Sequence, residues 1–362
     1  MSTKTTAPVV VSPNTIKYQE FDLPKIGPRD MLLKMKLCGV CGTDVHLFHG
    51  DWNPAYPLIL GHEILGEVAD VGREAAVKHN VKVGDLVNAE VLIPCNECYF
   101  CERGDYARCV KVELFGNISC ARPPYLWGGF GPYLYIPYNT RIHKFPKDVI
   151  PEAAVLIEPM GTAIRACKRS DVTVGTATVV IGPGPIGLVS VVAAKAYGAD
   201  PLILIGTRED RLSLGKELGA DHTIKIERNT SREEVAKKVR DIVNDHGLLA
   251  AVVLEAAGTV EAQKMGLGLL RPTGVMTIMG ATGSGKTVQL DTYYELLLGE
   301  QRVQGSNLSG WAYEPAVSII NSKRFPLEKI VTHSFPPAEL EKALDYSANR
   351  IENAIKVVIK HE

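Results

Sequence analysis

The segment Ala177-Thr-Val-Val-Ile-Gly-Pro-Gly-Pro-Ile-Gly187 joins a short apolar run to a glycine turn. Apolar residues typical of a helix follow at 188–197, and a second run of strand type covers 201–205. In this order of strand, turn, helix and strand, the glycines let N–H groups at the helix start approach a pyrophosphate. The segment therefore predicts a dinucleotide-binding turn, with candidate residues Gly182, Gly184, Pro185, Ile186 and Gly187.

The alternation of strands and helices continues beyond this turn. Ser231 and Glu234 have the spacing of a capping box, which predicts a helix that begins after Ser231. Further strands are predicted at 250–254 and 275–279, with a helix at 260–270 between them. The pattern predicts an α/β domain with a doubly wound parallel sheet.

The end of the second predicted strand bears on which form of the cofactor binds. An acidic residue at this point binds the ribose hydroxyls of NAD, but here the chain runs Gly206-Thr207-Arg208. The hydroxyl and the guanidinium, with Arg211 nearby, could hold a 2′-phosphate, so the sequence favours NADP(H) over NAD(H). In the alternative interpretation these residues only open the next helix, and Glu209 or Asp210 contacts the ribose.

A second phosphate-binding pattern lies at residues 280–287, where Gly-Ala-Thr-Gly-Ser-Gly-Lys-Thr fits G-x-x-x-x-G-K-[ST]. A true phosphate loop opens a helix, whereas residues 287–291 alternate like a strand. Dinucleotide glycines also already occupy the first strand of the same predicted sheet. A nucleoside triphosphate is therefore not expected at this loop.

The stretch Leu37-Cys-Gly-Val-Cys-Gly-Thr-Asp-Val-His46, together with Gly61-His-Glu63, carries residue types suited to a catalytic metal. A thiolate, an imidazole and a carboxylate are ligands of zinc, and a nearby hydroxyl and second imidazole could pass a proton outward. The candidate metal ligands are Cys41, His62 and Glu63. The candidate catalytic residues are Thr43, His46 and Glu63.

The spacing Cys38-Gly-Val-Cys41 also permits a redox pair or two unrelated core residues. Gly42-Thr-Asp44 is typical of a turn, so no helix is expected directly after Cys41, unlike in a thioredoxin-like pair. A further cluster of metal-type cysteines downstream favours the metal site as well.

That cluster is Cys95-Asn-Glu-Cys98-Tyr-Phe-Cys101, followed by Cys109 after seven residues. Four thiolates this close in sequence can enclose one tetrahedral zinc ion and leave no coordination position for a substrate. The predicted role is therefore structural. An iron–sulfur cluster is the competing interpretation, because thiolates at similar spacings hold those clusters too.

The N-terminal part of the chain has short apolar runs broken by glycine and proline, which predicts a mainly antiparallel β domain. Glu158-Pro159 then begins a helix, where a carboxylate is favoured whether or not it binds a metal. We expect a catalytic domain at 1–160 and 302–362, with a dinucleotide-binding domain at 161–301 inserted within it.

The composition limits the possible partners. The chain has 362 residues, enough for two domains, and its 40 basic and 41 acidic residues give no net field for nucleic acid or an anionic membrane. The sequence shows neither a signal peptide nor a run of eighteen apolar residues, so a cytoplasmic protein is expected. Four of the eight cysteines fall within residues 95–109, which favours metal binding in a reducing compartment over disulfides.

The order of the catalytic metal stretch, the four cysteines, Glu158-Pro159 and the glycine turn resembles the zinc-dependent medium-chain alcohol dehydrogenase family. Glu158-Pro159 is more similar to the sorbitol and threonine dehydrogenase branch. The resemblance covers essentially the whole chain and implies a GroES-like β domain beside a Rossmann domain. Relatives form dimers or tetramers, so a homodimer or homotetramer is expected.

The resemblance also assigns roles to residues. It implies that Cys41, His62 and Glu158 surround the catalytic zinc, with Glu63 as an alternating or water-bridged ligand. It further implies that Asp44 orients His62 and that Lys356 lies near the cofactor pyrophosphate.

The predicted function is hydride transfer between a nicotinamide cofactor, preferably NADP(H), and a secondary alcohol or polyol or the matching carbonyl compound. One catalytic and one structural zinc are expected. The first alternative is a zinc-free NADPH quinone reductase, which has no use for these metal ligands. The second is a non-enzymatic dinucleotide or zinc sensor, which gives no reason for Thr43 and His46 beside the metal.

Overall fold

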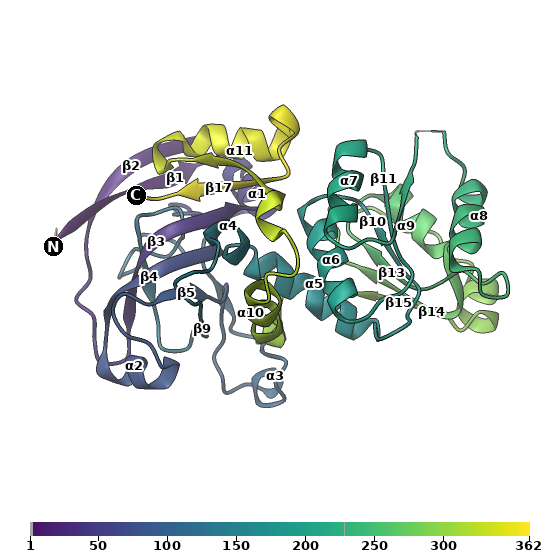
Figure 1. Ribbon diagram of the computed structural model, residues 1–362. Helices are drawn as coiled ribbons and strands as arrows, with labels where there is room; N and C mark the ends of the chain where they lie inside the picture. The colour runs from purple at the N-terminus through teal and green to yellow at the C-terminus, as the bar shows by residue number, and fades with distance from the viewer. Residues whose placement is uncertain (1–2, 228) are drawn as a thin grey trace. The chain divides into compact units, whose positions relative to one another are not determined.

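The computed structural model describes residues 3–227 and 229–362, which form two compact units (Figure 1). The first unit ends at Glu158 and resumes with Glu328–Glu362, and the second is Pro159–Leu327. The return to the first unit comes later than residue 302 because β15 (Arg302–Gly305) pairs with a strand of the second unit. The assignment of catalysis to one unit and dinucleotide binding to the other stays a prediction.

The first unit is built on a seven-stranded sheet with the order β16-β17-β3-β4-β5-β9, and β8 also pairs with β3. β16 and β17 run parallel, and the other neighbours pair antiparallel. Its strands are β3 (Met31–Val40), β4 (Glu63–Val71), β5 (Leu86–Ala89), β8 (Tyr133–Ile136), β9 (Ile142–Lys144), β16 (Val331–Phe335) and β17 (Lys356–Lys360). The mainly antiparallel β domain expected from the sequence is confirmed.

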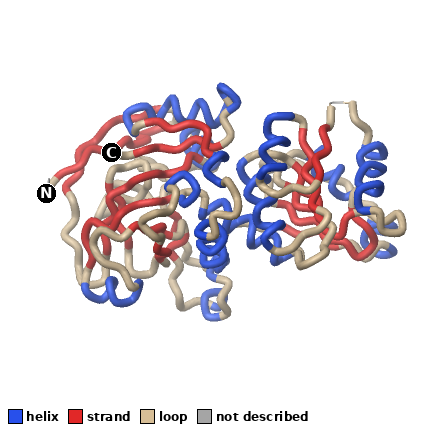
Figure 2. The backbone as a smooth tube through the Cα atoms, in the orientation of Figure 1, coloured by secondary structure: helices blue, strands red, loops and turns tan. Residues whose placement is uncertain are grey.

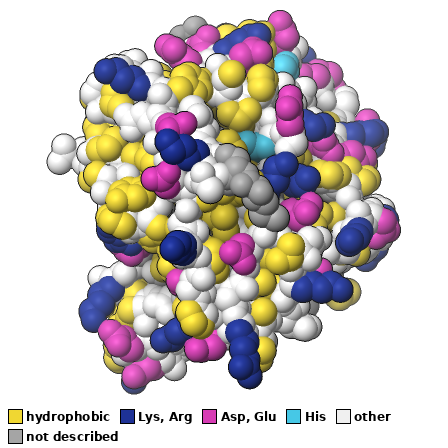
Figure 3. Space-filling view, turned by 90° about the vertical axis from the view of Figure 1, so that its left-hand side faces the viewer, with side chains coloured by type: hydrophobic (Ala, Val, Ile, Leu, Met, Phe, Trp, Pro, Cys, Tyr) yellow, Lys and Arg dark blue, Asp and Glu magenta, His cyan; other side chains and the backbone are white. Residues whose placement is uncertain are grey.

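Smaller elements complete this unit. β1 (Lys4–Ser12) and β2 (Thr15–Asp22) form a hairpin, and β6 (Leu92–Ile93) pairs with β7 (Glu113–Leu114). The helices are α1 (Gly42–His49), α2 (Arg73–His79), α3 (Tyr99–Glu102), α4 (Pro151–Ala154) and α11 (Leu340–Asn349). On the face of this unit drawn in Figure 3, basic and acidic side chains are interspersed.

Strand pairing brings distant segments together at the end of β3. Gly39 lies between Val358 of β17 on one side and Glu63 of β4 on the other. Lys356 begins β17, directly before the residue that pairs with Val40. The sheet therefore places Lys356 beside Glu63, although 293 positions separate them in the sequence.

The expectation of no helix after Cys41 is wrong, because α1 begins at Gly42. Cys41 is the N-cap in an extended conformation, and its N–H donates to the Asp44 side chain at 2.8 Å. Gly50 ends the helix in the left-handed region, with φ of +90°. Asp44, one of the residues that suggested a turn, instead caps the first turn of a helix.

The second unit is a six-stranded parallel sheet with the order β12-β11-β10-β13-β14-β15. Its strands are β10 (Thr178–Ile181), β11 (Leu202–Gly206), β12 (His222–Lys225), β13 (Ala250–Glu255), β14 (Leu270–Ile278) and β15. Its helices are α6 (Pro185–Ala196), α7 (Glu209–Glu217), α8 (Arg232–Val243), α9 (Val260–Leu267) and α10 (Tyr313–Asn321), and α5 (Ile157–Arg169) leads into it. Figure 2 shows these strands in red among blue helices. Counted along the chain, this is the strand order 3-2-1-4-5-6 of a doubly wound dinucleotide fold, as predicted.

The glycine turn has the geometry that its sequence predicts. Gly182 follows β10 with φ of +100°, and Gly184 is the N-cap of α6. A Cβ on Gly187 would lie 1.8 Å from the carbonyl oxygen of Gly182, so a side chain there would force the helix away from the strand. The turn thus needs glycine at position 182 for its backbone angle and at position 187 for close packing of the helix against the strand.

Two further local patterns in the sequence lie at the start of α8 and at residues 280–287. Ser231 caps α8, accepting from the N–H of Glu234 at 3.1 Å. No helix opens at Lys286, and the next element is the short helical segment η2 (Thr292–Leu298). This agrees with the expectation that residues 280–287 are not a nucleotide phosphate loop. Within the described residues, no helix is long and apolar enough to cross a membrane.

Candidate functional site

The structure brings together three predicted metal ligands of the first unit. Cys41 lies at the N-cap of α1, Glu63 begins β4, and His62 directly precedes it. One potential ligand atom of each residue lies within 4.8 Å of the others. His62 and Glu63 are buried, whereas Cys41 is partly exposed. A thiolate, an imidazole and a carboxylate at this separation can share a zinc ion.

Glu63 is held by a buried cation. The Lys356 ammonium contacts Glu63 Oε1 and donates to the carbonyl oxygen of Val40 at 3.0 Å. The other carboxylate oxygen, Oε2, is buried without a hydrogen-bond partner and lies where a Cβ on Gly39 would come within 1.9 Å. A buried carboxylate oxygen normally has a partner, so this unpaired acceptor suits a cation. The residues present therefore fit a metal ion.

Asp44 connects the segments that carry these ligands. Its Oδ2 accepts from the N–H of Cys41, and its Oδ1 accepts from the N–H of Gly61 at 3.1 Å. Oδ1 also lies 3.3 Å from His62 Nδ1. Burial lowers the pKa of His62, but Asp44 and the Cys41 sulfur raise it well above its ordinary value. With Nδ1 facing Asp44, the other ring nitrogen is left as the metal-ligating atom.

Glu158 lies in the first turn of α5 and is buried, but its carboxylate is outside the group formed by Cys41, His62 and Glu63. Burial, followed by the charge of Glu63, raises the pKa of Glu158 to about 7. The charges of the site thus affect the pKa of the Glu158 carboxyl group, although this group lies outside the cluster of Cys41, His62 and Glu63. Its role as a zinc ligand stays a prediction.

The predicted proton-transfer residues both lie on α1. The Thr43 hydroxyl is 3.8 Å from the Cys41 sulfur, and His46 is one helical turn further along. His46 is exposed, and its Nδ1 lies 2.7 Å from Asp51 Oδ2. The helix that the sequence did not predict thus carries both residues on adjacent turns.

The redox alternative for Cys38 and Cys41 has little support in the structure. Cys38 is completely buried within β3, and its thiol contacts the carbonyl oxygen of Gly39. Burial raises its pKa well above the ordinary value. A reactive thiol needs the opposite shift, so Cys38 is best explained as a core residue.

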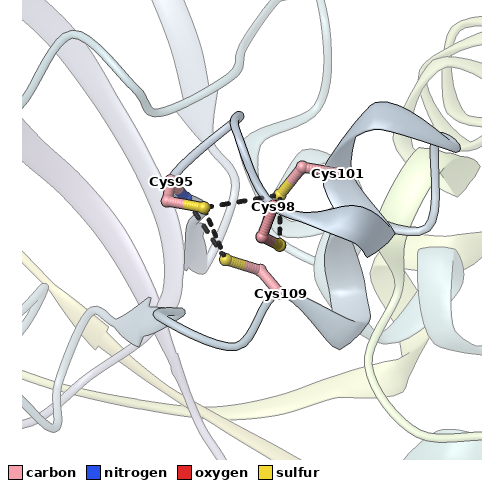
Figure 4. Close-up of side chains that lie close together, drawn as sticks. All are labelled: Cys95, Cys98, Cys101 and Cys109. Carbon is pink, nitrogen blue, oxygen red and sulfur yellow. Dashed lines mark hydrogen bonds between the residues drawn. The ribbon is translucent and has the colours of Figure 1, made fainter.

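Cys95, Cys98, Cys101 and Cys109 form the second group, with their sulfur atoms within 4.8 Å of one another (Figure 4). The N–H groups of Cys95 and Lys111 donate to the Cys109 sulfur at 3.3 and 3.4 Å. Backbone N–H groups lower the pKa of Cys98 to about 6, while burial and neighbouring thiols raise that of Cys101 to about 12. Four sulfurs this close, with N–H groups directed at them, fit a bound cation.

Eight of the nine candidate cofactor residues occupy two adjacent strand ends in the second unit. The ninth, Lys356, is buried against Glu63 in the first unit, and its place near the pyrophosphate stays a prediction. Gly182 and Gly184 lie in the turn between β10 and α6, and Pro185, Ile186 and Gly187 begin α6. Gly206 ends β11, and Thr207 and Arg208 follow it. Thr207 is exposed and Arg208, the N-cap of α7, is partly exposed. Arg211 is only 5% exposed, so its proposed assistance with a phosphate has little support. The alternative acid Glu209 lies 3.9 Å from Lys225.

Two contacts of buried charged side chains were not predicted from the sequence. The pairing of Lys356 with Glu63 joins two ends of the chain, and no local pattern signals it. Glu255 ends β13 and accepts from the N–H groups of Ala257 and Gly258 at 2.8 and 2.7 Å. Burial raises the pKa of Glu255. A carboxylate ending an apolar strand just before Ala-Ala-Gly is a signal that could have identified this turn.

Comparison with known proteins identifies the class. Residues 27–147 match the alcohol dehydrogenase GroES-like domain, and residues 185–322 match the zinc-binding dehydrogenase domain. Erythritol/L-threitol dehydrogenase of Mycolicibacterium smegmatis is 32% identical, over 97% of this chain and 96% of that protein. Sorbitol dehydrogenase of Bombyx mori is 31% identical, over 99% of each chain. The crystal structure of an alcohol dehydrogenase from Thermotoga maritima superposes with a TM-score of 0.92 at 31% identity, covering all of both chains.

The chain therefore belongs to the zinc-dependent medium-chain alcohol dehydrogenase family, in its sorbitol and threonine dehydrogenase-like branch. The resemblance stated from the motifs is confirmed, as is the combination of a GroES-like domain with a Rossmann-type sheet. The family comprises oxidoreductases that use zinc and a nicotinamide cofactor.

The buried pair of Lys356 and Glu63 gives a test of the site's electrostatics. Lys356→Met should destabilise the chelator-treated protein by about 3–5 kcal/mol, because it leaves a buried carboxylate without its cation. Lys36→Met is the matched control, because Lys36 lies 3.5 Å from Glu67 across β3 and β4 in an exposed pair. It should change the free energy of unfolding by less than about 1 kcal/mol. Urea unfolding of the wild type and the two variants measures both changes in the free energy of unfolding. Equal losses of stability in Lys356→Met and Lys36→Met would contradict a stabilising buried ion pair.

Proposed function

We propose that this protein catalyses reversible hydride transfer between a secondary alcohol or polyol and a nicotinamide cofactor, with NADP(H) preferred. The observation that carries the proposal is the convergence of Cys41, His62 and Glu63, with one buried oxygen of Glu63 unpaired. The names of the erythritol and sorbitol dehydrogenases support a polyol as the substrate class.

Two zinc ions fit the two donor groups. Cys41, His62 and Glu63 would hold the catalytic ion, and Glu158 would be a further or alternating ligand, supported by its burial within the electrostatic influence of Glu63 and His62. When bound, this zinc would act as a Lewis acid toward the substrate oxygen. The structural ion would be held by Cys95, Cys98, Cys101 and Cys109.

The protein's own residues would prepare the site and remove the proton. Asp44 fixes the orientation of His62 and the position of Cys41, and Lys356 holds the Glu63 carboxylate in place. Thr43 and His46 would carry the alcohol proton from the buried site toward solvent, because one is partly buried near Cys41 and the other is exposed. The glycine turn at residues 182–187 would hold the nicotinamide cofactor, which would supply the hydride acceptor when bound.

Neither alternative function accounts for these residues. A zinc-free quinone reductase gives no role to the three converging ligands or to the four cysteines. A sensor that only binds zinc and a dinucleotide gives no role to a hydroxyl and an imidazole on the helix that begins at Cys41.

The zinc-dependent reaction can be tested with a panel of polyols and secondary alcohols. Cys41→Ser should lower kcat by about a thousandfold or more, because Lewis-acid stabilisation contributes several kcal/mol. Cys120→Ala, at a buried thiol outside both donor groups, should retain activity. Metal analysis should show that Cys41→Ser loses one zinc and keeps the other. Full activity after complete removal of both metals would refute the proposal.

Selection of NADP(H) is proposed to depend on Thr207 and Arg208. Arg208→Asp should lower the ratio of kcat/KM for NADP to that for NAD by about ten- to a hundredfold, because a charged hydrogen bond contributes about 1.5–3 kcal/mol. Arg232→Asp, at the start of the next helix, is the matched control and should leave the ratio unchanged. An unchanged ratio in Arg208→Asp would contradict the assignment.

We also propose that a second copy of the chain covers one surface of the second unit. The segment η2 exposes five large apolar side chains, those of Tyr293, Tyr294, Leu296, Leu297 and Leu298. The segment shortly precedes β15, the last strand of the sheet, whose outer edge is open within the described structure. An open edge can pair with its own copy about a twofold axis, and the apolar residues would add buried area.

This surface predicts the oligomeric state. The protein should be a homodimer or homotetramer by light scattering after gel filtration, and the double variant Tyr294→Glu/Leu297→Glu should shift it toward the monomer. Val174→Glu is the control, because Val174 is a more exposed apolar residue of the same unit that lies away from this segment in the sequence. A monomeric wild-type protein at micromolar concentration would contradict the proposal.

A further inference from the structure

The chain directly after α1 folds back onto His46. Asp51 donates its N–H to the carbonyl oxygen of His46 at 2.9 Å, and its carboxylate lies 2.7 Å from His46 Nδ1. The Trp52 ring packs against the imidazole, with 4.6 Å between ring centroids and 33° between planes. Two consecutive side chains therefore contact the same histidine, one at a ring nitrogen and one on the ring.

The backbone of this segment adopts an unfavourable conformation for its sequence. Trp52 has φ of +64° and Asn53 has φ of +51°, both in the left-handed region. Asparagine tolerates this region, but a bulky residue such as tryptophan rarely occupies it. Trp52 is also 61% exposed, so burial of its ring does little to offset the strain. Its contribution to stability therefore does not explain the arrangement, whereas contact with His46 does.

We propose that Asp51 and Trp52 are positioning residues for His46. They hold the ring so that its Nδ1–H donates to the Asp51 carboxylate and its Nε2 lone pair is free to accept a proton. The proposal rests on the proposed dehydrogenase function for the source of that proton. In the oxidation direction, the carbon–hydrogen bond of the alcohol supplies a hydride to the cofactor and its hydroxyl supplies a proton. His46 Nε2 accepts the proton and releases it to water, leaving the carbonyl product.

The surroundings of His46 define which groups can act on it. Asp51 is the charged group in contact with the ring, and Trp52 covers the ring without adding charge. Tyr56 is a titratable neighbour of Asp51, and burial, followed by the Asp51 charge, raises its pKa. The Tyr56 hydroxyl is occupied, because it donates to the carbonyl oxygen of Leu47 at 2.6 Å. Asp51 is therefore the group whose removal should change the proton positions on His46.

The same helix provides a matched control. His49, three residues further along α1, is also exposed, and its Nδ1 lies 2.6 Å from Asn14 Oδ1. Asn14 has φ of +56°, so Asn14→Gly removes the amide group while keeping the backbone conformation accessible. Asp51→Ala and Asn14→Gly thus each remove the Nδ1 partner of one exposed histidine on α1.

The first measurement is the proton position on the free enzyme, with zinc in place and without substrate. Nitrogen NMR of histidine-labelled protein, with the His46 signals assigned by their loss in His46→Gln, reports which ring nitrogen carries the proton in the neutral ring. We expect the proton on Nδ1 in the wild type and in Asn14→Gly, and a shift toward Nε2 in Asp51→Ala. A wild-type ring protonated at Nε2, or no change in Asp51→Ala, would overturn the proposal.

The second measurement is kinetic. Asp51→Ala should lower kcat by about tenfold and change KM by less than about twofold, because a misoriented general base slows proton transfer without removing substrate contacts. Added imidazole should restore part of the loss, whereas Asn14→Gly should match the wild type without it. Unchanged kcat in Asp51→Ala, or a loss that imidazole does not restore, would contradict the positioning role. Absence of dehydrogenase activity in the wild type would instead refute the proposed function and leave the NMR result to decide the orientation of His46.

Discussion

The arrangement of the first unit depends on a buried carboxylate that contacts a buried ammonium group. Glu63 is only 1% exposed, and Lys356, at 3%, contacts one of its two oxygens. Burying two charges carries a large desolvation cost that their attraction repays only when the remaining polar atoms are satisfied. The second oxygen of Glu63 is not satisfied by the protein. A metal ion shared with Cys41 and His62 would complete this group, so folding and metal binding are expected to be coupled.

Backbone architecture explains how this group forms. β3 lies between β4 and β17, and the absence of a side chain at Gly39 leaves room for the Glu63 carboxylate. Asp44 then ties the start of α1 to the end of the loop before β4 through backbone N–H groups. Glu63 therefore lies on a strand, Cys41 caps a helix, and His62 directly precedes the strand, which suits a site that must hold its geometry through a reaction.

Local patterns were sufficient for most of the fold. The turn at Gly182–Gly187 and the alternation of strands and helices after it define the second unit, because each signal is contained in a few neighbouring residues. The helix after Cys41 was missed because its N-cap is a cysteine and its first turn contains glycine, threonine and aspartate. Those residues favour turns as well as helix starts, and the reciprocal contact of Cys41 with Asp44 decides between the two.

The site was predictable where ligand types cluster in the sequence and less so where the fold assembles them. The cysteines at 95–109 and the residues Cys41, His62 and Glu63 come together as expected. The contact of Lys356 with Glu63 depends on strand pairing across nearly the whole chain, and no local motif contains it. No local pattern predicts the contacts of Asp51 and Trp52 with His46 either, because they depend on how the chain turns back after α1.

The central claim is that Cys41, His62 and Glu63 share one zinc ion. The most direct measurement is anomalous X-ray scattering from crystals of the zinc-loaded protein, recorded on both sides of the zinc absorption edge. We predict one peak among Cys41, His62 and Glu63 and a second among the four cysteines at 95–109. A peak only at the four cysteines, with Cys41 and His62 making no bond to a metal, would contradict this account.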